Sequence, residues 1–307
     1  MSLRRVFVGV LLLAVLVFSG IPVEAHLEMQ GIAPPIPTRA ELDAMAAAPD
    51  GPVRIRFVNT SSQTTPEARE GAHPGFLLEW PDGRAFLIDV GMERPAAVEF
   101  GKPMEWLGAQ PAVPHGSVGE QMGTDAARIA GVAFTHLHFD HTGGMKQLCD
   151  AAGHGLDVYQ TPYQFERVNF GTQMGLDDLA ASGCAKRRRL EADGDAPYFQ
   201  IPGFPGVFAI PAAGHTPGST MYAVRIGPTF WILSGDVTNS KPNLLSDTPK
   251  PLLYSLFIVP ENRGRLGVLR RWLAGLDAEP STIVVPSHDG TALREAGMPA
   301  YSSVAGS

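Results

Sequence analysis

The stretch that decides the fold is Thr135-His136-Leu137-His138-Phe139-Asp140-His141-Thr142-Gly143-Gly144. It follows the apolar residues 129–134, which predict a buried strand. Four of its side chains, His136, His138, Asp140 and His141, are potential metal ligands. Imidazole and carboxylate suit zinc and neighbouring divalent metals. The stretch therefore predicts a metal site where a strand passes into a loop.

Three further potential ligands occupy similar positions later in the chain. His215 lies in the small-residue turn Ala213-Gly214-His215-Thr216-Pro217-Gly218, Asp236 ends the apolar stretch 229–236, and His288 ends the stretch 281–288. Each follows a predicted strand, so all of them can emerge at one edge of a sheet, where functional loops gather. With nine histidines in the chain, the cluster in residues 136–141 alone could arise by chance. Three further ligands at the ends of predicted strands make chance a poor explanation.

These motifs, in this order, resemble the metallo-β-lactamase-fold hydrolase superfamily, and the resemblance extends over residues 53–288. It implies an α/β fold, the four-layer αββα sandwich. It also implies two divalent metal ions, most simply Zn²⁺. His136, His138 and His215 would hold one ion, Asp140, His141 and His288 the other, and Asp236 would bridge them. Asp89 resembles the structural aspartate that lies near the metals in this superfamily.

Within the superfamily, the sequence of the motif from His136 to Gly144 is most similar to that of the N-acyl-homoserine lactone lactonases. An aspartate at the bridging position resembles hydrolases of lactones, thioesters and phosphoesters, whereas true β-lactamases commonly carry cysteine there or lack the bridge. The best-known lactonases place a tyrosine three residues after this aspartate, where this chain has Asn239. Periplasmic β-lactam hydrolysis, an iron-dependent persulfide dioxygenase and a degenerate metal-binding module are the alternatives.

The resemblance implies catalysis by a hydroxide derived from metal-bound water, which attacks a carbonyl carbon. Asp140 and Asp236 are the catalytic carboxylates: Asp140 orients the water or carries a proton, and Asp236 holds the metals at their working separation. Asn239 and Tyr254 are the candidate substrate contacts. An apolar rim suited to an acyl chain is expected from Met104, Trp106, Phe165, Phe170 and Leu244.

The first residues have the pattern of a secretory signal peptide. A basic start at Arg4 and Arg5 precedes an apolar run over residues 6–18 and small residues up to Ala25. Residues 1–25 are predicted to be removed, which makes the protein periplasmic or secreted with no stable membrane insertion; an uncleaved anchor is the alternative. Residues 26–52 are predicted to lie along the surface, and residues 53–307 to form one hydrolase domain.

The charge of the chain indicates which kinds of partner to expect, and its cysteine content indicates whether a disulfide can form. The chain has 24 basic and 31 acidic residues, a net charge of −7, which gives no electrostatic reason to expect nucleic acid. A small-molecule substrate is expected, and the sequence leaves the oligomeric state open. The basic run 186–189 is interpreted as a solvated face or helix end. Cys149 and Cys184 are the two cysteines, and after export they could be bridged or free.

Local patterns complete the sequence predictions. Residues 76–80 and 85–90 predict a hairpin around Pro81-Asp82-Gly83, residues 92–121 a long loop, and residues 161–179 and 261–276 helices. Threonines beside the motifs are candidate hydrogen-bond partners of metal-bound imidazoles; they are Thr135, Thr142 and Thr216. The other histidines are expected to be ordinary surface or loop residues; they are His26, His73, His115 and His154.

Overall fold

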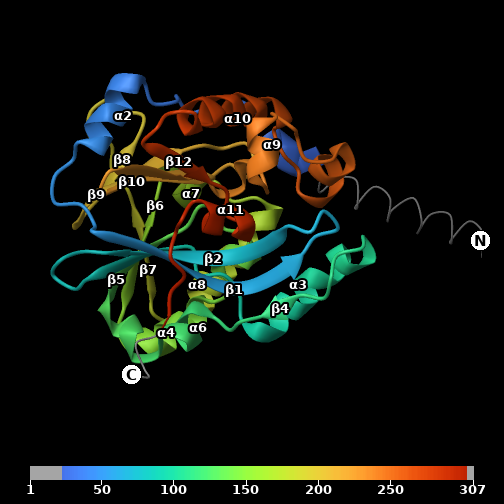
Figure 1. Ribbon diagram of the computed structural model, residues 1–307, viewed down its shortest axis with the longest axis horizontal. Coiled ribbons are helices and arrows are strands. Elements are labelled where there is room, and N and C mark those ends of the chain that lie inside the picture. The colour runs from blue at the N-terminus through green and yellow to red at the C-terminus, as the bar shows by residue number, and fades with distance from the viewer. Residues whose placement is uncertain (1–22, 303–307) are drawn as a thin grey trace, which may run out of the picture.

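Two stacked β-sheets form the centre of the protein, and helices cover the outer face of each (Figure 1). The structure is a computed structural model that describes residues 23–302. One sheet has the spatial order β4 (Val113–Pro114), β1 (Arg54–Thr64), β2 (Glu70–Glu79), β3 (Ala85–Ile88), β5 (Ile129–Ala133), β6 (Leu156–Gln160) and β7 (Ala185–Arg189). The other has the order β12 (Thr282–Val285), β11 (Thr229–Leu233), β10 (Thr220–Ile226), β9 (Phe204–Pro211) and β8 (Phe199–Ile201).

The helices form the two outer layers and the connections. Those nearest the first sheet are α3 (Arg94–Trp106), α4 (Val118–Met122), η1 (Gly123–Arg128), α5 (Phe139–Thr142), α6 (Met145–Ala152), α7 (Pro162–Glu166) and α8 (Phe170–Ala181). The others are α2 (Arg39–Ala46), η2 (Gly235–Val237), α9 (Lys241–Leu245), the π-helical turn η3 (Tyr254–Ile258) and α10 (Arg263–Asp277), while α11 (Gly290–Glu295) contacts β2 of the first sheet.

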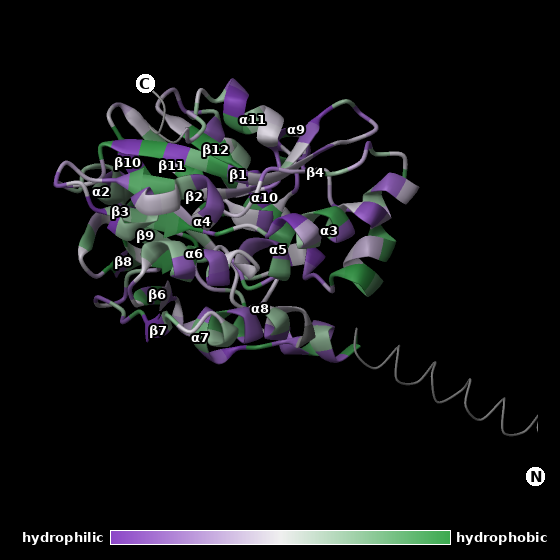
Figure 2. Cartoon of the chain, turned by 90° about the horizontal axis from the view of Figure 1, so that it is seen from below, coloured by the Kyte–Doolittle hydropathy of each residue, from purple (hydrophilic) through white to green (hydrophobic). Residues whose placement is uncertain are grey.

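Three apolar layers hold the sandwich together. Phe76 and Phe86 of the first sheet meet Tyr222 and Trp231 of the second in the central layer. A second layer packs α4, α6 and α8 on the first sheet, and a third packs α2 and α10 on the second. In Figure 2 several central strands are largely green, β7 is purple and the helices show mixed colours. Full burial of each large apolar side chain stabilises the fold by about 1.5–3 kcal/mol. The predicted αββα sandwich is confirmed.

The hairpin of β2 and β3 fixes which residues reach the functional edge. Its register pairs Glu79 with Ala85 and Phe76 with Ile88, as the Pro81-Asp82-Gly83 turn predicts. β3, β5, β6 and β7 are parallel, so their carboxyl ends lie at one edge. Because β2 is antiparallel to β3, the beginning of β2 lies at that same edge.

Two predicted elements differ from the structure. The segment 92–121 is not a long loop, because α3, β4 and α4 lie within it. Pro95 lies in the first turn of α3, where a missing N–H costs nothing, and the helix also accommodates Pro103 in its interior, so these prolines do not indicate a loop. The helix predicted over 161–179 is interrupted between α7 and α8, where Arg167 is extended and the Asn169 side chain caps α8 by accepting from the Thr172 N–H (3.0 Å).

The helix predicted over 261–276 begins later, at Arg263. The Asn262 side chain caps it by accepting a hydrogen bond from the Arg265 N–H (3.0 Å). Glu261 therefore lies outside the helix, and its side chain is buried. The basic run 186–189 is a solvated face, as predicted, but on a strand and not at a helix end: Lys186, Arg188 and Arg189 are exposed on the edge strand β7, where Arg188 pairs with Asp157 and Arg189 with Glu166. Charged side chains on an edge strand discourage pairing with another sheet.

The amino-terminal segment, residues 26–52, does not only lie along the surface but also contributes to the core. Leu42 and Met45 of α2 are buried in the apolar layer on the second sheet. The predicted signal peptide falls mostly on residues 1–22, which lie outside the described residues, and its removal stays a prediction. Over residues 23–302, the structure contains no helix with the length and apolar character needed to cross a bilayer.

A disulfide joins Cys149 of α6 to Cys184, just before β7, with Cα atoms 5.7 Å apart. The sequence left this pairing open, and the structure forms it. The bond ties α6, which begins after the His136 to Gly144 stretch, to the strand at the edge of the first sheet.

Candidate metal centre

The seven predicted ligands converge at one edge of the sandwich. His136 and His138 follow β5, Asp140 and His141 lie on α5, and His215 lies between β9 and β10. Asp236 lies on η2 after β11, and His288 follows β12. His138 and His288 are half-buried and the other five are buried. The structure thus brings together every residue that the strand-end pattern selected, and their role as ligands stays a prediction.

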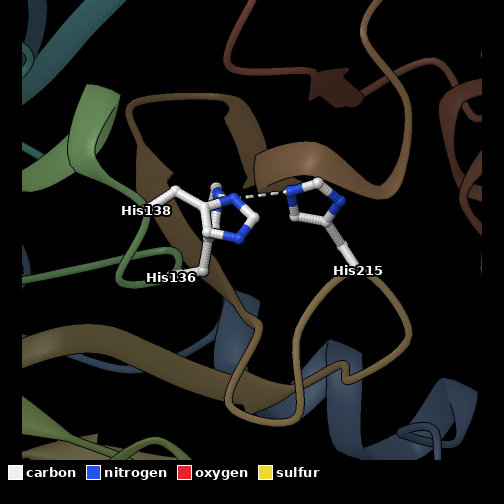
Figure 3. A group of neighbouring side chains, drawn as sticks. All are labelled: His136, His138 and His215. Atoms are coloured by element: carbon white, nitrogen blue, oxygen red, sulfur yellow. Dashed lines mark hydrogen bonds between the residues drawn. The ribbon is translucent and has the colours of Figure 1, made fainter. Parts of the chain in front are cut away.

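The first group of potential ligands consists of His136, His138 and His215. The three offer ring nitrogens within 4.8 Å of one another. The Nδ1 atom of His138 lies 2.9 Å from His136 Nε2 and 3.1 Å from His215 Nε2 (Figure 3). Two donor atoms that bind one zinc ion in tetrahedral geometry lie about 3.4 Å apart. The spacing therefore fits a single ion held by three imidazoles.

Asp236 connects this group to the remaining ligands. Its Oδ2 atom lies 3.5 Å from His215 Nε2 and 3.1 Å from His288 Nε2. Its Oδ1 atom lies 3.6 Å from His141 Nε2. Asp140 lies in the second group, with Oδ2 3.2 Å from His288 Nε2 and 3.6 Å from His141 Nε2. One carboxylate therefore faces both groups, as a bridging ligand must.

Two buried atoms of this cluster lack hydrogen bonds. Neither Asp236 Oδ1 nor His141 Nε2 has a hydrogen-bond partner within the part of the chain that the structure describes. Unpaired buried polar atoms are rare in proteins. Burial disfavours a charged Asp236, but the positive charge of His288 and its hydrogen bond outweigh burial and hold the pKa of Asp236 well below its usual range. An anionic oxygen and a ring nitrogen left without partners fit a divalent cation.

Hydrogen bonds orient three of the imidazoles through their second ring nitrogen. Nδ1 of His141 donates to Asp89 Oδ2 (2.9 Å), and Nδ1 of His288 donates to the backbone oxygen of Ala72 (2.9 Å). Nδ1 of His215 donates to Glu261 Oε1 (2.6 Å). Each bond leaves Nε2 directed at the cluster, which is the usual arrangement of metal-binding histidines.

Of the three threonines selected from the sequence, one supports the centre. Thr135 donates its N–H to Asp89 Oδ1 (2.8 Å) and its hydroxyl to Asp89 Oδ2 (2.7 Å). Thr142 donates to Asp178 (2.6 Å), and the Thr216 hydroxyl pairs with that of Ser219 (2.9 Å). The last two therefore hold the loops and do not touch the imidazole nitrogens.

A buried ion pair behind His215 escaped the sequence analysis. Lys250 Nζ donates to Glu261 Oε1 (2.8 Å) and to the backbone oxygen of Asp236 (3.2 Å), and Ser255 Oγ donates to Glu261 Oε2 (2.7 Å). Burial opposes ionisation of Glu261, but the hydrogen bond from His215 and the charge of Lys250 lower its pKa to about 2. Glu261 is therefore a carboxylate at neutral pH. No local sequence pattern marks this contact.

His73 also belongs to the cluster, so its interpretation as an ordinary surface or loop histidine is wrong. Its side chain is 15% exposed and its Nδ1 atom lies 3.5 Å from Asp140 Oδ2. The predicted hairpin contains the missed signal, because extending its register beyond Phe76 brings His73 beside the residues that follow Asp89. His115 and His154 are exposed, as expected, and His26 is hydrogen-bonded to the backbone oxygen of Leu256 (3.3 Å).

The two candidate substrate contacts, Asn239 and Tyr254, differ in their exposure to solvent. Asn239 is exposed. Tyr254 is half-buried, and burial together with the negative charges of Asp236 and Glu261 raises the pKa of its hydroxyl. Tyr254 is thus close enough to Asp236 to sense its charge, and its hydroxyl stays protonated at neutral pH.

The expected apolar rim is partly wrong. Leu244 is fully buried in the layer under α10, and Phe165 packs against the Arg187 guanidinium (4.3 Å). Met104 and Trp106 are exposed on α3, and the Phe170 side chain lies outside the described residues. Phe100, which the sequence analysis did not select, is the residue of α3 whose ring contacts His73 (centroids 5.2 Å apart).

Comparisons with known proteins agree with this architecture. A sequence comparison with curated proteins finds no match. Among solved structures, an N-acyl homoserine lactone hydrolase with the product N-hexanoyl-L-homoserine at its catalytic metal center is 16% identical, with TM-score 0.55, covering 82% of this chain and 98% of that one. A mutant of AiiA from B. thuringiensis with N-decanoyl-L-homoserine at the active site is 16% identical, with TM-score 0.53 and coverage of 82% and 98%.

A probable metal-dependent hydrolase from Staphylococcus aureus is 13% identical, with TM-score 0.50 and coverage of 78% and 90%. At such identities the likeness establishes the fold. The family model described as the metallo-beta-lactamase superfamily matches residues 68–288, which contain all seven predicted ligands and His73. The chain therefore belongs to the metallo-beta-lactamase superfamily, as a metal-dependent hydrolase.

Proposed function

We propose that this protein is an exported dinuclear-metal hydrolase that opens lactones of the N-acyl-homoserine lactone type or related esters. The observation that carries the dinuclear part is the position of Asp236, whose two oxygens face both groups of ligands at 3.1–3.6 Å. A site for one ion would not need a buried carboxylate directed at both groups.

The residues around the ions have distinct tasks. Two divalent ions, when bound, supply hydroxide near neutral pH and polarise a carbonyl oxygen. Asp140 is a carboxylate, because the charge of His141 and the hydrogen bond from His288 overcome burial and hold its pKa well below the usual range. Because its Oδ2 atom faces the other ligands of the second group, its Oδ1 atom is the one that would orient the water or carry a proton toward the leaving oxygen. The protonated hydroxyl of Tyr254 can donate a hydrogen bond to the substrate.

The lactone assignment has two supports. The solved structures that share the fold include proteins with N-hexanoyl- or N-decanoyl-L-homoserine at the active site. Beside the cluster, Phe100 and Met104 of α3 are exposed, as are Leu253 and Phe257 near Tyr254. Exposed apolar side chains beside a polar site suit a substrate with a polar head and an apolar chain.

The function is tested by an assay of metal-replete protein against lactones, thioesters, phosphodiesters and β-lactams. Lactones are expected to be cleaved, and chelation is expected to abolish activity. kcat/KM should rise with acyl length by up to about fourfold per methylene, since each buried methylene contributes about 0.8 kcal/mol. Protein that cleaves β-lactams but no lactone would show that the alternative, a β-lactamase, is correct.

Replacing the bridging aspartate tests the dinuclear arrangement. Asp236→Ala is expected to lower kcat/KM by roughly 100-fold or more, because the two ions lose their common ligand. The apolar strand β11 before it is unchanged, so the melting temperature of metal-free protein should stay near that of the wild type. The exposed Asp195 provides a control, Asp195→Ala, which should retain full activity. Full activity of metal-replete Asp236→Ala would contradict the bridging role.

The buried ion pair predicts an effect at the first metal. Glu261→Gln keeps the size of the side chain but removes the charge that His215 and Lys250 share, so affinity for the ion bound by His136, His138 and His215 should fall about 10–100-fold. Competition with a chelator measures this affinity. Glu295→Gln, at an exposed position, is the matched control. Equal affinities in the two variants would mean that Glu261 does not support the metal.

Export is part of the proposal. Intact-mass analysis of protein from the periplasm or medium should find a chain that begins at His26. Before reduction it should contain no free thiol, because Cys149 and Cys184 are bridged and an oxidising compartment preserves the bond. A protein that retains residues 1–25 would instead support the uncleaved anchor.

A further inference from the structure

We propose that His73 is an eighth ligand of the metal centre, and that its Nδ1 atom binds the second ion beside Asp140 and His288. This inference rests on the second ion of the proposed function. None of the seven ligands implied by the superfamily resemblance lies on β2, so His73 would add a strand to the set that holds the metals.

The positions of the donor atoms fit a shared ion. His73, Asp140 and His288 offer one donor atom each within 4.8 Å of one another. The separation of His73 Nδ1 and Asp140 Oδ2, 3.5 Å, is close to the roughly 3.4 Å expected for two donors on one tetrahedral ion. It exceeds the usual length of a hydrogen bond from nitrogen to oxygen. A metal ion accounts for this spacing better than a direct hydrogen bond does.

The Nδ1 atom of His73 is also without a hydrogen bond. It is buried and has no partner among residues 23–302. Within the centre, His141 Nε2 and Asp236 Oδ1 are in the same condition, and both belong to the predicted ligand set. His73 belongs to a group of donors with Asp140 and His288, whereas His141 and Asp236 group with His136, so both neighbouring groups contain unpaired buried atoms. A cation held by His73, Asp140 and His288 would account for the unpaired Nδ1 atom of His73.

The ring of His73 is held in place before any ion binds. It packs edge-on against Phe100 (centroids 5.2 Å) and against His288 (4.7 Å). The His73 N–H donates to Asn59 Oδ1 (3.0 Å), and its backbone oxygen accepts from the Thr60 hydroxyl (2.7 Å). A ligand whose backbone and ring are both fixed loses little conformational freedom when it binds a metal.

An eighth ligand would make the two metal positions unequal. The first ion would have three imidazoles and the Asp236 carboxylate. The second would have His73, Asp140, His141 and His288 as well as Asp236. Zinc prefers four ligands, whereas other divalent ions accept more, so the second position would tolerate a wider range of metals.

The test measures metal affinity in the mature protein. Wild type and His73→Ala are freed of metal by chelation and titrated with Co²⁺, and dissociation constants for both ions are obtained by chelator competition. His73→Ala is expected to bind one of the two ions at least about tenfold less tightly than the wild type does and the other ion normally. His154→Ala, which removes an exposed histidine, should bind both ions as the wild type does. Two ions bound by His73→Ala with wild-type affinity would overturn the proposal, even if its activity fell.

A gain of signal provides a second readout. In His73→Cys the sulfur would lie near the place of Nδ1, and its thiolate should give a sulfur-to-cobalt charge-transfer absorption that the wild type lacks. This variant decides the matter if His73→Ala does not fold, and two bound cobalt ions without that absorption would then reject the ligand role. A wild-type protein that binds a single ion would overturn the dinuclear proposal itself, and this inference with it.

Discussion

The carboxylate of Asp89 is the contact on which the centre depends. Fully buried at the end of β3, it accepts hydrogen bonds from the N–H and hydroxyl of Thr135 and from Nδ1 of His141. Hydrogen bonds to a charged group contribute about 1.5–3 kcal/mol each, more than neutral ones. They join the ends of two neighbouring parallel strands and aim His141 at the cluster. The scaffold and the metal site therefore share one anion.

At the same edge of the sheets, buried polar atoms without partners destabilise the metal-free protein, and a bound cation would remove that penalty. Six imidazoles and the carboxylates of Asp140 and Asp236 are brought together, and several of their donor atoms are buried without partners. Burying polar groups without hydrogen bonds is unfavourable. Bound cations would convert these contacts into ligand bonds, so metal binding would add to the stability of the fold as well as supply the chemistry. The apolar layers on both sides of the sheets provide the rigidity that holds this arrangement.

The sequence predicts the parts of the centre that lie at strand ends, because an apolar run followed by a ligand is a local pattern. His136, Asp236 and His288 are found this way, and so is the hairpin of β2 and β3. Glu261 and Lys250 are not found, because their contact with His215 depends on how distant segments fold together. The prediction for Leu244 is wrong for a related reason: an apolar side chain on a short helix can face the substrate or the core, and the packing of α9 against α10 decides which. The position of His73 could have been predicted from the sequence, since it follows from the register of the hairpin.

A chain of buried contacts joins the turn η3, which carries Tyr254, to His215. Tyr254 lies on the π-helical turn η3, next to Ser255, whose hydroxyl binds Glu261. Glu261 in turn orients His215, and Lys250, which neutralises Glu261, also lies 5.6 Å from the Tyr254 ring. Asn239 stands where the best-known lactonases have tyrosine, but it is exposed, whereas the Tyr254 hydroxyl senses the charge of Asp236. Under the proposed function, Tyr254 of η3 would take the place of the tyrosine that follows the bridging aspartate in those lactonases. One buried ion pair therefore contacts both Tyr254 and His215, so under the proposed function a change in that pair would affect the substrate contact and the first metal position together.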